Sequence, residues 1–184
     1  MAGTPGNANF VTPAIYFDFS TTNCTIQENT IYDRTKKGIF LNASTNNNSV
    51  TGNVVYGGNY AIDFNGAPNP NIPNYINMTG MTVKNNSFFA KDPAAYIIRM
   101  LDNTSGYNHG IIDSNFYFHP YDPGKYAEIV PSPDYSFALW QTNTGYDIHS
   151  KNSFVSWTLP TSDDTLIMNQ TDNAVNVNLG TTKY

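Results

Sequence analysis

Apolar residues recur along this chain in a four-residue phrase: an asparagine, any residue, an apolar or aromatic residue, and an aromatic residue. Four copies occur, beginning at Asn29, Asn53, Asn86 and Asn115. Each has a β-branched apolar residue three positions before its asparagine, at Ile26, Val50, Val83 and Ile112. The copies are 24, 33 and 29 residues apart (53−29, 86−53 and 115−86). Spacings of about 20 to 50 residues are typical of stacked supersecondary units, so the pattern predicts a repeat protein.

A short run of alternating apolar and polar residues precedes each copy of the phrase. These runs cover residues 14–19, 38–42, 60–65 and 96–101, and a fifth, weaker run follows at 126–130. With its phrase, each cycle is expected to hold two short strands joined by polar corners that contain Gly, Asn or Asp. The stretch 66–77, which contains three prolines, is an inserted loop that explains the longest spacing.

A single cycle is too short to bury its own apolar face. Stacking the cycles buries that face, and each strand then hydrogen-bonds in parallel to its equivalents about 4.8 Å above and below. The pattern therefore predicts an all-β fold, a parallel β-helix of about four to five coils. An antiparallel sandwich is the alternative, because it also has short strands and frequent turns, but its strands recur about every 8 to 12 residues.

The chain changes character after residue 118. Prolines at positions 120, 123, 131 and 133 are incompatible with a continuous strand ladder. We therefore predict β-helix coils over residues 1–133 and a C-terminal capping region over residues 134–184. Two apolar runs between residues 165 and 179 predict a strand pair within that region.

The capping region is also expected to contain a short helix. Asp134 or Ser136 is suited to cap its N-terminus, with Phe137 and Trp140 on one face. Gly145 is expected to end it.

Composition narrows the classes of function. Charged residues make up only 12% of the 184 residues, against about 25% in typical soluble domains, so neutral polar groups must carry solubility. The chain has nine Lys and Arg residues and fourteen Asp and Glu residues, which gives a net charge of −5. This negative charge argues against nucleic acid and membrane surfaces as partners. The single cysteine, Cys24, excludes an internal disulfide and a cysteine-based zinc site, and is expected to be a packed thiol. The N-terminus has no signal-peptide pattern.

Two segments downstream of the repeats suggest a family. Residues 140–150, Trp-Gln-Thr-Asn-Thr-Gly-Tyr-Asp-Ile-His-Ser, resemble a segment that follows the last coils in secreted bacterial right-handed parallel β-helix proteins of the pectate-lyase-like superfamily. Residues 169–172, Asn-Gln-Thr-Asp, are similar to the opening of their C-terminal β cap. The asparagine phrase itself resembles their coil repeat, in which the asparagine side chains stack at a turn.

This resemblance implies the C-terminal portion of a longer, secreted or cell-surface protein that acts on or binds polysaccharide. Members are mostly polysaccharide lyases or glycoside hydrolases, so the type of reaction stays open. No cofactor is predicted from the residues, and calcium is implied by the resemblance alone. No metal-ligand spacing is present.

One column of side chains is the main candidate site. Aligning the first strand of each cycle places Ile15, Ile39, Ile62, Ile98 and Ala127 in one inward column. The next residues, Tyr16, Phe40, Asp63, Arg99 and Glu128, are then expected to point to solvent. Asp63, Arg99 and Glu128 are the candidate catalytic residues, and Tyr16 and Phe40 the candidate sugar-binding residues, because aromatic rings pack on pyranose rings. Exposed strand residues without a ligand are the alternative.

Other candidates lie at the corners and in the cap. Arg34 and Lys36, in the most basic stretch of the chain, are candidates for binding an anionic polymer, with a solvated turn as the alternative. His149 lies beside Asp147 and Ser150, but a hydrogen-bonded structural histidine is favoured over a catalytic triad. Asn29, Asn53, Asn86 and Asn115 are interpreted as a structural ladder of stacked amides.

The sequence thus favours a carbohydrate-active β-helix module, with polysaccharide as its partner. Whether it is an enzyme stays open. The alternative is a non-catalytic structural or adhesive module, or one that associates end to end with its own kind.

Overall fold

A computed structural model describes residues 13–32, 36–43, 45–66, 77–91, 93–101, 108–119, 121–122, 124–130, 134–152 and 176. The chain divides into two compact units, Met1–Phe154 and Val155–Tyr184. All the described strands and the one described helix belong to the first unit. The domain boundary predicted between residues 133 and 134 stays a prediction, and the strand pair expected between 165 and 179 lies outside the described residues.

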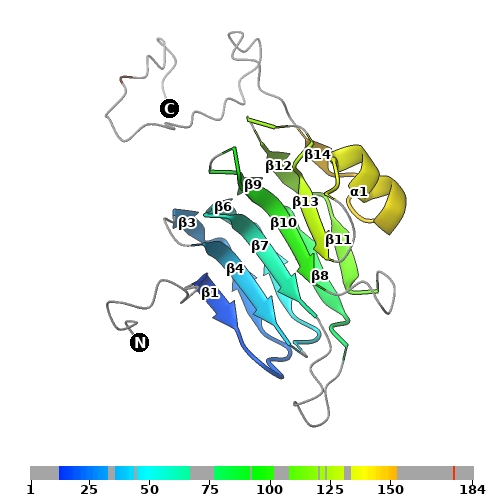
Figure 1. Ribbon diagram of the computed structural model, residues 1–184. Helices are drawn as coiled ribbons and strands as arrows, with labels where there is room; N and C mark the ends of the chain where they lie inside the picture. Colours follow the sequence, from blue (N-terminus) through cyan, green and yellow to red (C-terminus); the bar gives the residue numbers. More distant parts are fainter. Residues whose placement is uncertain are drawn as a thin grey trace. The chain divides into compact units, whose positions relative to one another are not determined.

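The strands form three sheets, and from β1 to β13 consecutive strands join the three sheets in turn (Figure 1). The first sheet runs β1 (Pro13–Phe17), β4 (Lys37–Asn42), β7 (Tyr60–Asn65), β10 (Tyr96–Leu101) and β13 (Ala127–Val130). The second runs β11 (Gly110–Asp113), β8 (Met81–Lys84), β5 (Ser49–Thr51) and β2 (Thr25–Gln27). The third runs β14 (Lys151–Asn152), β12 (Phe116–Phe118), β9 (Ser87–Phe89), β6 (Val54–Tyr56) and β3 (Thr30–Tyr32).

Neighbouring strands pair in parallel throughout the three described sheets. The prediction of an all-β fold with parallel pairing between cycles is therefore confirmed. An antiparallel sandwich would need antiparallel ladders between its strands, and among the described residues only one isolated antiparallel bridge occurs, between Ala127 and Tyr135. The arrangement is compatible with a parallel β-helix.

The expectation of two strands in each cycle is wrong, because the chain bends just before each asparagine and divides the expected second strand into two. The residue before each asparagine adopts left-handed backbone geometry, with φ of 55° at Glu28, 66° at Gly52, 56° at Asn85 and 59° at Ser114. Such a residue turns an extended chain sharply. Each cycle therefore contributes a third short strand, and the asparagine lies at the corner between the second and third sheets.

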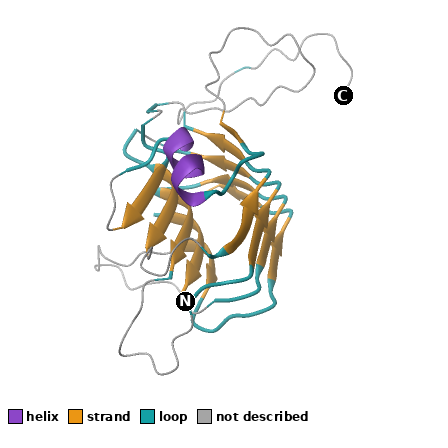
Figure 2. Ribbon diagram, turned by 90° about the vertical axis from the view of Figure 1, so that its right-hand side faces the viewer, coloured by secondary structure: helices purple, strands orange, loops and turns teal. Residues whose placement is uncertain are grey.

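The apolar core lies between the sheets, and the strands surround it (Figure 2). Ile39, Ile62 and Ile98 occupy equivalent positions on adjacent strands of the first sheet and are fully buried. Val55 and Phe88 do the same on the third sheet. This stacking of like residues follows directly from the parallel register.

Helix α1 (Phe137–Thr144) follows β13 in the chain (Figure 1), and its Phe137 ring contacts the rings of Tyr117 and Tyr126. Ser136 caps it by accepting a hydrogen bond from the Leu139 backbone at 3.4 Å, and Gly145 ends it with φ of 72°. The predicted helix is thus confirmed; of the two N-cap candidates Ser136 is the cap, and Gly145 ends the helix as expected. Trp140 is fully buried. Among the described residues, no helix is long and apolar enough to cross a membrane. Cys24 is exposed, so the expectation of a packed thiol is wrong.

Candidate functional site

The outer face of the first sheet carries the candidate column. The strand register pairs Tyr16 with Phe40, Phe40 with Asp63, Asp63 with Arg99, and Arg99 with Glu128. The inward column from Ile15 to Ala127 is aligned in the same way. The predicted alignment is therefore confirmed for both columns.

The charged members of this column, together with Lys37, form a continuous chain of ion pairs. Lys37 Nζ lies 2.5 Å from Asp63 Oδ2, and Arg99 Nη1 lies 3.2 Å from the same oxygen. Arg99 Nε lies 3.2 Å from Glu128 Oε2, which also accepts a 2.6 Å hydrogen bond from the Tyr60 hydroxyl. Two cations thus alternate with two carboxylates along the sheet, and their charges sum to zero.

Asp63 is the centre of this chain, and its expected exposure to solvent is wrong. Its side chain is 0% exposed beneath Lys37 and Arg99, whereas Arg99 is 23% and Glu128 is 29% exposed. Burial raises the pKa of Asp63, and the charges of Lys37 and Arg99 oppose that rise. Burial likewise lowers the pKa of Lys37, opposed by Asp63. Glu128 is therefore the carboxylate of this pair that solvent reaches.

The aromatic residues stack on one another along the sheet. The rings of Tyr16 and Phe40 lie 5.1 Å apart at an interplanar angle of 9°. Lys37 Nζ lies 3.3 Å from the centre of the Phe40 ring while it contacts Asp63 on the next strand. Phe40 is thus enclosed between a tyrosine and an ammonium group, so only Tyr16 of this pair, 45% exposed, presents a ring to a ligand.

A second aromatic pair lies beside the ion pairs. The rings of Tyr60 and Tyr96 are 6.3 Å apart, and the guanidinium of Arg99 lies 5.0 Å from the Tyr60 ring. Lys125 Nζ lies 5.9 Å from the Tyr96 ring, and the Tyr96 hydroxyl donates to Asp134 at 2.7 Å. Burial, followed by the hydrogen-bonded carboxylates, raises the pKa of both tyrosines, so both keep their protons at neutral pH.

Sequence reasoning missed Lys37, Tyr60 and Tyr96 as members of this face. Strict alternation counted back from Asp63 places Tyr60 inward, but its hydroxyl reaches Glu128 on the outer face. The register pairs Lys37 with Tyr60 and Tyr60 with Tyr96, so the three are equivalent. A signal was available in the sequence, since Tyr60 and Tyr96 each begin an alternating run and Lys37 directly precedes one.

Hydroxyl and amide groups form the other border of the face. The Tyr16 hydroxyl donates to Asp18 Oδ1 at 2.7 Å, and the Asn42 amide donates to Tyr16 at 2.9 Å and to Asp18 at 3.0 Å. Asn65 donates to Asn42 Oδ1 at 2.6 Å. Burial and the contact with Asp18 raise the pKa of Tyr16 to about 12.

The structure places only one of the two basic candidates at the corner, Lys36. Lys36 is exposed, and its backbone carbonyl accepts a hydrogen bond from Tyr60 at 3.1 Å. Arg34 lies outside the described residues. The structure therefore brings Tyr16, Phe40, Asp63, Arg99 and Glu128 together on one face and leaves the roles of Arg34 and Lys36 as predictions.

The four repeat asparagines form a continuous series of hydrogen bonds, here called the asparagine ladder. The side-chain amide of Asn29 donates to Asn53 Oδ1 at 3.0 Å, that of Asn53 to Asn86 Oδ1 at 2.9 Å, and that of Asn86 to Asn115 Oδ1 at 3.0 Å. Each accepting oxygen also receives the backbone N–H of the donating asparagine. Asn53, Asn86 and Asn115 are buried and their amides are satisfied within the ladder, so they do not offer groups to a ligand. Asn29, the first member, is exposed.

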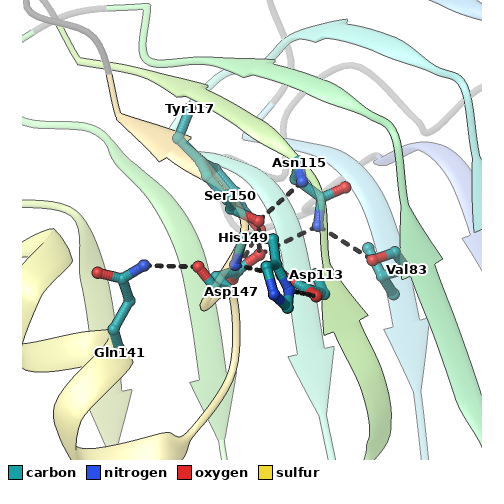
Figure 3. Close-up of polar contacts among 8 residues, drawn as sticks. All are labelled: Val83, Asp113, Asn115, Tyr117, Gln141, Asp147, His149 and Ser150. Atoms are coloured by element: carbon teal, nitrogen blue, oxygen red, sulfur yellow. Dashed lines mark hydrogen bonds and ion pairs between the residues drawn. The ribbon is translucent and has the colours of Figure 1, made fainter.

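The ladder ends on Asp147, which is fully buried (Figure 3). Asp147 Oδ1 accepts from the Asn115 amide at 3.2 Å and from the Ser150 hydroxyl at 2.5 Å. The Tyr117 hydroxyl lies 3.0 and 2.9 Å from the two carboxylate oxygens, and Trp140 Nε1 donates to Oδ2 at 2.7 Å. Four side-chain donors thus surround a carboxylate that has no cationic partner among the described residues.

His149 is turned away from Ser150 and toward Asp113 (Figure 3). Its Nδ1 lies 2.7 Å from Asp113 Oδ2, and its backbone N–H donates to Asp113 Oδ1 at 2.8 Å. The Ser150 hydroxyl donates instead to Asp147 and accepts the Asn115 backbone N–H at 2.8 Å. A serine nucleophile needs its histidine within hydrogen-bond reach, so these residues do not form a catalytic triad.

Comparisons with protein-family models, with curated proteins and with solved structures gave no match to this chain. What the structure defines is an all-β protein of three parallel sheets and one short helix, with an internal asparagine ladder. Within the described residues, no group of three or more His, Cys, Asp or Glu side chains is arranged to hold a metal ion.

Proposed function

We propose that this chain is a right-handed parallel β-helix of about four to five coils that binds polysaccharide on the outer face of its first sheet. In this proposal it is the C-terminal part of a longer, extracellular protein of the pectate-lyase-like type. Support for the fold comes from the three parallel sheets and the buried asparagines. Support for the binding role comes from the outer face of the first sheet.

One observation carries the binding proposal: tyrosines and paired charges share a single sheet face. Tyr16 and Phe40 continue directly into the ion pairs of Asp63, Arg99 and Glu128. Tyrosine rings pack against the apolar faces of sugar rings, and partly exposed charged groups hydrogen-bond to hydroxyls. Strands that repeat in register present these groups at regular intervals, as a polymer of repeated sugar units requires.

The charge balance of the face decides how such a ligand binds. Lys37 and Arg99 are matched by Asp63 and Glu128, so the face has no excess of positive charge for a polyanion. Binding therefore rests on hydroxyl groups and ring contacts. Because counterions contribute little to such contacts, affinity should change little between low and physiological salt.

The binding test uses affinity gels that contain one polysaccharide each, from a panel of neutral and uronate-containing polymers. Retardation by at least one polymer is expected. Tyr16→Ala should weaken that retardation about twofold to tenfold, because one ring contact is worth about 0.5–1.5 kcal/mol. Tyr32→Ala is the matched control, since Tyr32 is a more exposed tyrosine, at 72%, on the third sheet. Equal retardation of wild type and Tyr16→Ala, or no retardation by any polymer, would refute the proposal.

Cleavage of the bound polymer is the second candidate function. The observation that favours it is the position of Arg99 between the carboxylates of Asp63 and Glu128, of which Glu128 is accessible. The assay reads absorbance from unsaturated chain ends and, separately, new reducing ends. Glu128→Gln should abolish either signal while leaving retardation in the gel. Absence of both signals for wild type would leave a binding module without catalysis.

A further inference from the structure

A buried amine and a buried carboxyl group touch between two neighbouring strands of the first sheet. Lys37 begins β4 and Asp63 lies in β7, and these strands pair in parallel. Lys37 Nζ lies 2.5 Å from Asp63 Oδ2, and the two side chains are 8% and 0% exposed. The carboxyl carbon is one bond beyond that oxygen, so the nitrogen lies near the separation of about 3–3.5 Å at which two groups are positioned to react.

Aromatic rings hold the amine in this position. Lys37 Nζ lies 3.3 Å from the centre of the Phe40 ring, and the Tyr16 ring stacks on Phe40 at 5.1 Å. Groups of one molecule that are held in a reactive geometry reach effective concentrations of about 10⁵–10⁸ M. A condensation that is slow between free amines and acids in water therefore becomes accessible to these two side chains.

Burial also favours the neutral forms of the two groups, which condensation requires. It raises the pKa of Asp63 and lowers the pKa of Lys37, while the attraction between their charges opposes both shifts. The ionised pair and the neutral pair carry the same total charge, so passing one proton from Lys37 to Asp63 adds no buried charge. The transfer produces a nucleophilic amine and a carboxyl group that is able to lose its hydroxyl.

The two oxygens of Asp63 have different surroundings. Oδ2 also lies 3.2 Å from Arg99 Nη1, whereas Oδ1 is buried and has no hydrogen-bond partner among the described residues. A guanidinium beside Oδ2 stabilises the negative charge that this oxygen gains when a nitrogen attacks the carboxyl carbon. Oδ1 is then the oxygen that takes up protons and leaves.

We propose that Lys37 and Asp63 condense into an isopeptide bond that links β4 to β7. Lys37 Nζ forms a bond to Cγ of Asp63, and the bond between Cγ and Oδ1 breaks. Of the three protons on the ammonium group, one stays on the amide nitrogen and two leave with Oδ1 as one molecule of water. The reaction needs no other reactant. It closes residues 37–63 into a covalent loop, which restricts the unfolded chain as a disulfide does.

This cross-link does not rest on polysaccharide binding. It removes one positive and one negative charge, so the charges of the outer face still sum to zero. The ring of Tyr16 and the ion pair between Arg99 and Glu128 stay in place. The cross-linked chain therefore keeps the exposed groups on which the proposed function depends.

The test is the intact mass of the full chain, measured by mass spectrometry under denaturing conditions. The mass of the wild type should be lower than that of its amino-acid sequence by one water molecule. Digestion should release a branched species that joins the peptide containing Lys37 to the peptide containing Asp63, and its fragment ions locate the bond. Lys37→Arg and Asp63→Ala should each have the full mass of their own sequences.

Lys36→Arg is the matched control, because Lys36 is the adjacent, exposed lysine. This variant should lose one water molecule as the wild type does. Circular dichroism of each variant checks that the sheets are intact, and the wild-type measurement decides by itself if a variant does not fold. The proposal is overturned if the wild type has its full mass, if Lys37→Arg still loses water, or if fragment ions place the loss at other residues. Because the assay contains no polysaccharide, its failure leaves the proposed function untouched.

Discussion

Replacing Asp147 with asparagine is the most informative perturbation of this fold. The substitution preserves shape and removes the charge, but it also turns one acceptor oxygen into an NH₂ donor. In the native structure both carboxylate oxygens accept: Oδ1 from Asn115 and Ser150, Oδ2 from Trp140, and both from Tyr117. The NH₂ group of an asparagine at this position must therefore face either the donors of Asn115 and Ser150 or the indole N–H of Trp140.

The less costly orientation puts the new NH₂ group toward Trp140. The indole N–H then loses a 2.7 Å hydrogen bond and stays buried without a partner, which costs about 1–3 kcal/mol. The hydrogen bonds that remain lose their charge assistance, which is worth about as much again as a neutral bond. Because burial raises the pKa of Asp147, relief from burying a charge outweighs this lost charge assistance. The unpartnered indole N–H therefore sets the upper limit, and we expect a net destabilisation of about 1–3 kcal/mol.

Urea unfolding followed by fluorescence and circular dichroism measures this difference. With a slope of about 2 kcal/mol per molar urea, the midpoint should fall by about 0.5–1.5 M. Asp113→Asn is the matched control, because that carboxylate bonds the exposed His149 at the surface, and it should shift the midpoint by less than about 0.5 M. Equal midpoints for Asp147→Asn and wild type would refute the view that this carboxylate terminates the ladder.

Three further predictions concern the same fold. Asn86→Leu should destabilise by about 1–3 kcal/mol in urea unfolding, because the buried Asn53 amide loses its acceptor; a neutral effect would contradict the ladder. Ser136→Ala should cost about 1 kcal/mol by removing the cap of α1, and an unchanged midpoint would mean that the cap contributes nothing. Burial raises the pKa of Asp147 above its ordinary value of 3.8. As pH falls, the Asp147 carboxylate therefore binds a proton in the folded state at a higher pH than in the unfolded state. The stability that this protonation contributes is lost as pH rises through the folded pKa. The urea midpoint of wild type relative to Asp147→Asn should therefore increase as pH falls from 7 toward 4, and a decrease would contradict the raised pKa.

The sequence alone was enough for the repeat and for its register. A phrase that returns with the same residue types fixes which residues are equivalent, and parallel pairing then places equivalents side by side. That is why Tyr16 and Phe40 could be aligned correctly with Asp63, Arg99 and Glu128. The caps of α1 were equally predictable, since Ser136 and Gly145 act through hydrogen bonds and backbone geometry within one turn.

The tertiary structure decided what the sequence pattern could not, because burial depends on neighbours that are distant along the chain. Alternation puts Asp63 on the outer face, but only the folded sheet brings Lys37 and Arg99 over it and removes it from solvent. The corner before each asparagine also escaped the pattern, because a left-handed residue is permitted by Glu28 or Ser114 but not dictated by them. Likewise, the place of Asp147 at the end of the ladder depends on a contact across 32 residues with Asn115. Periodicity is a local property of the chain, whereas electrostatic partners and solvent exposure are set by the packing of separate segments.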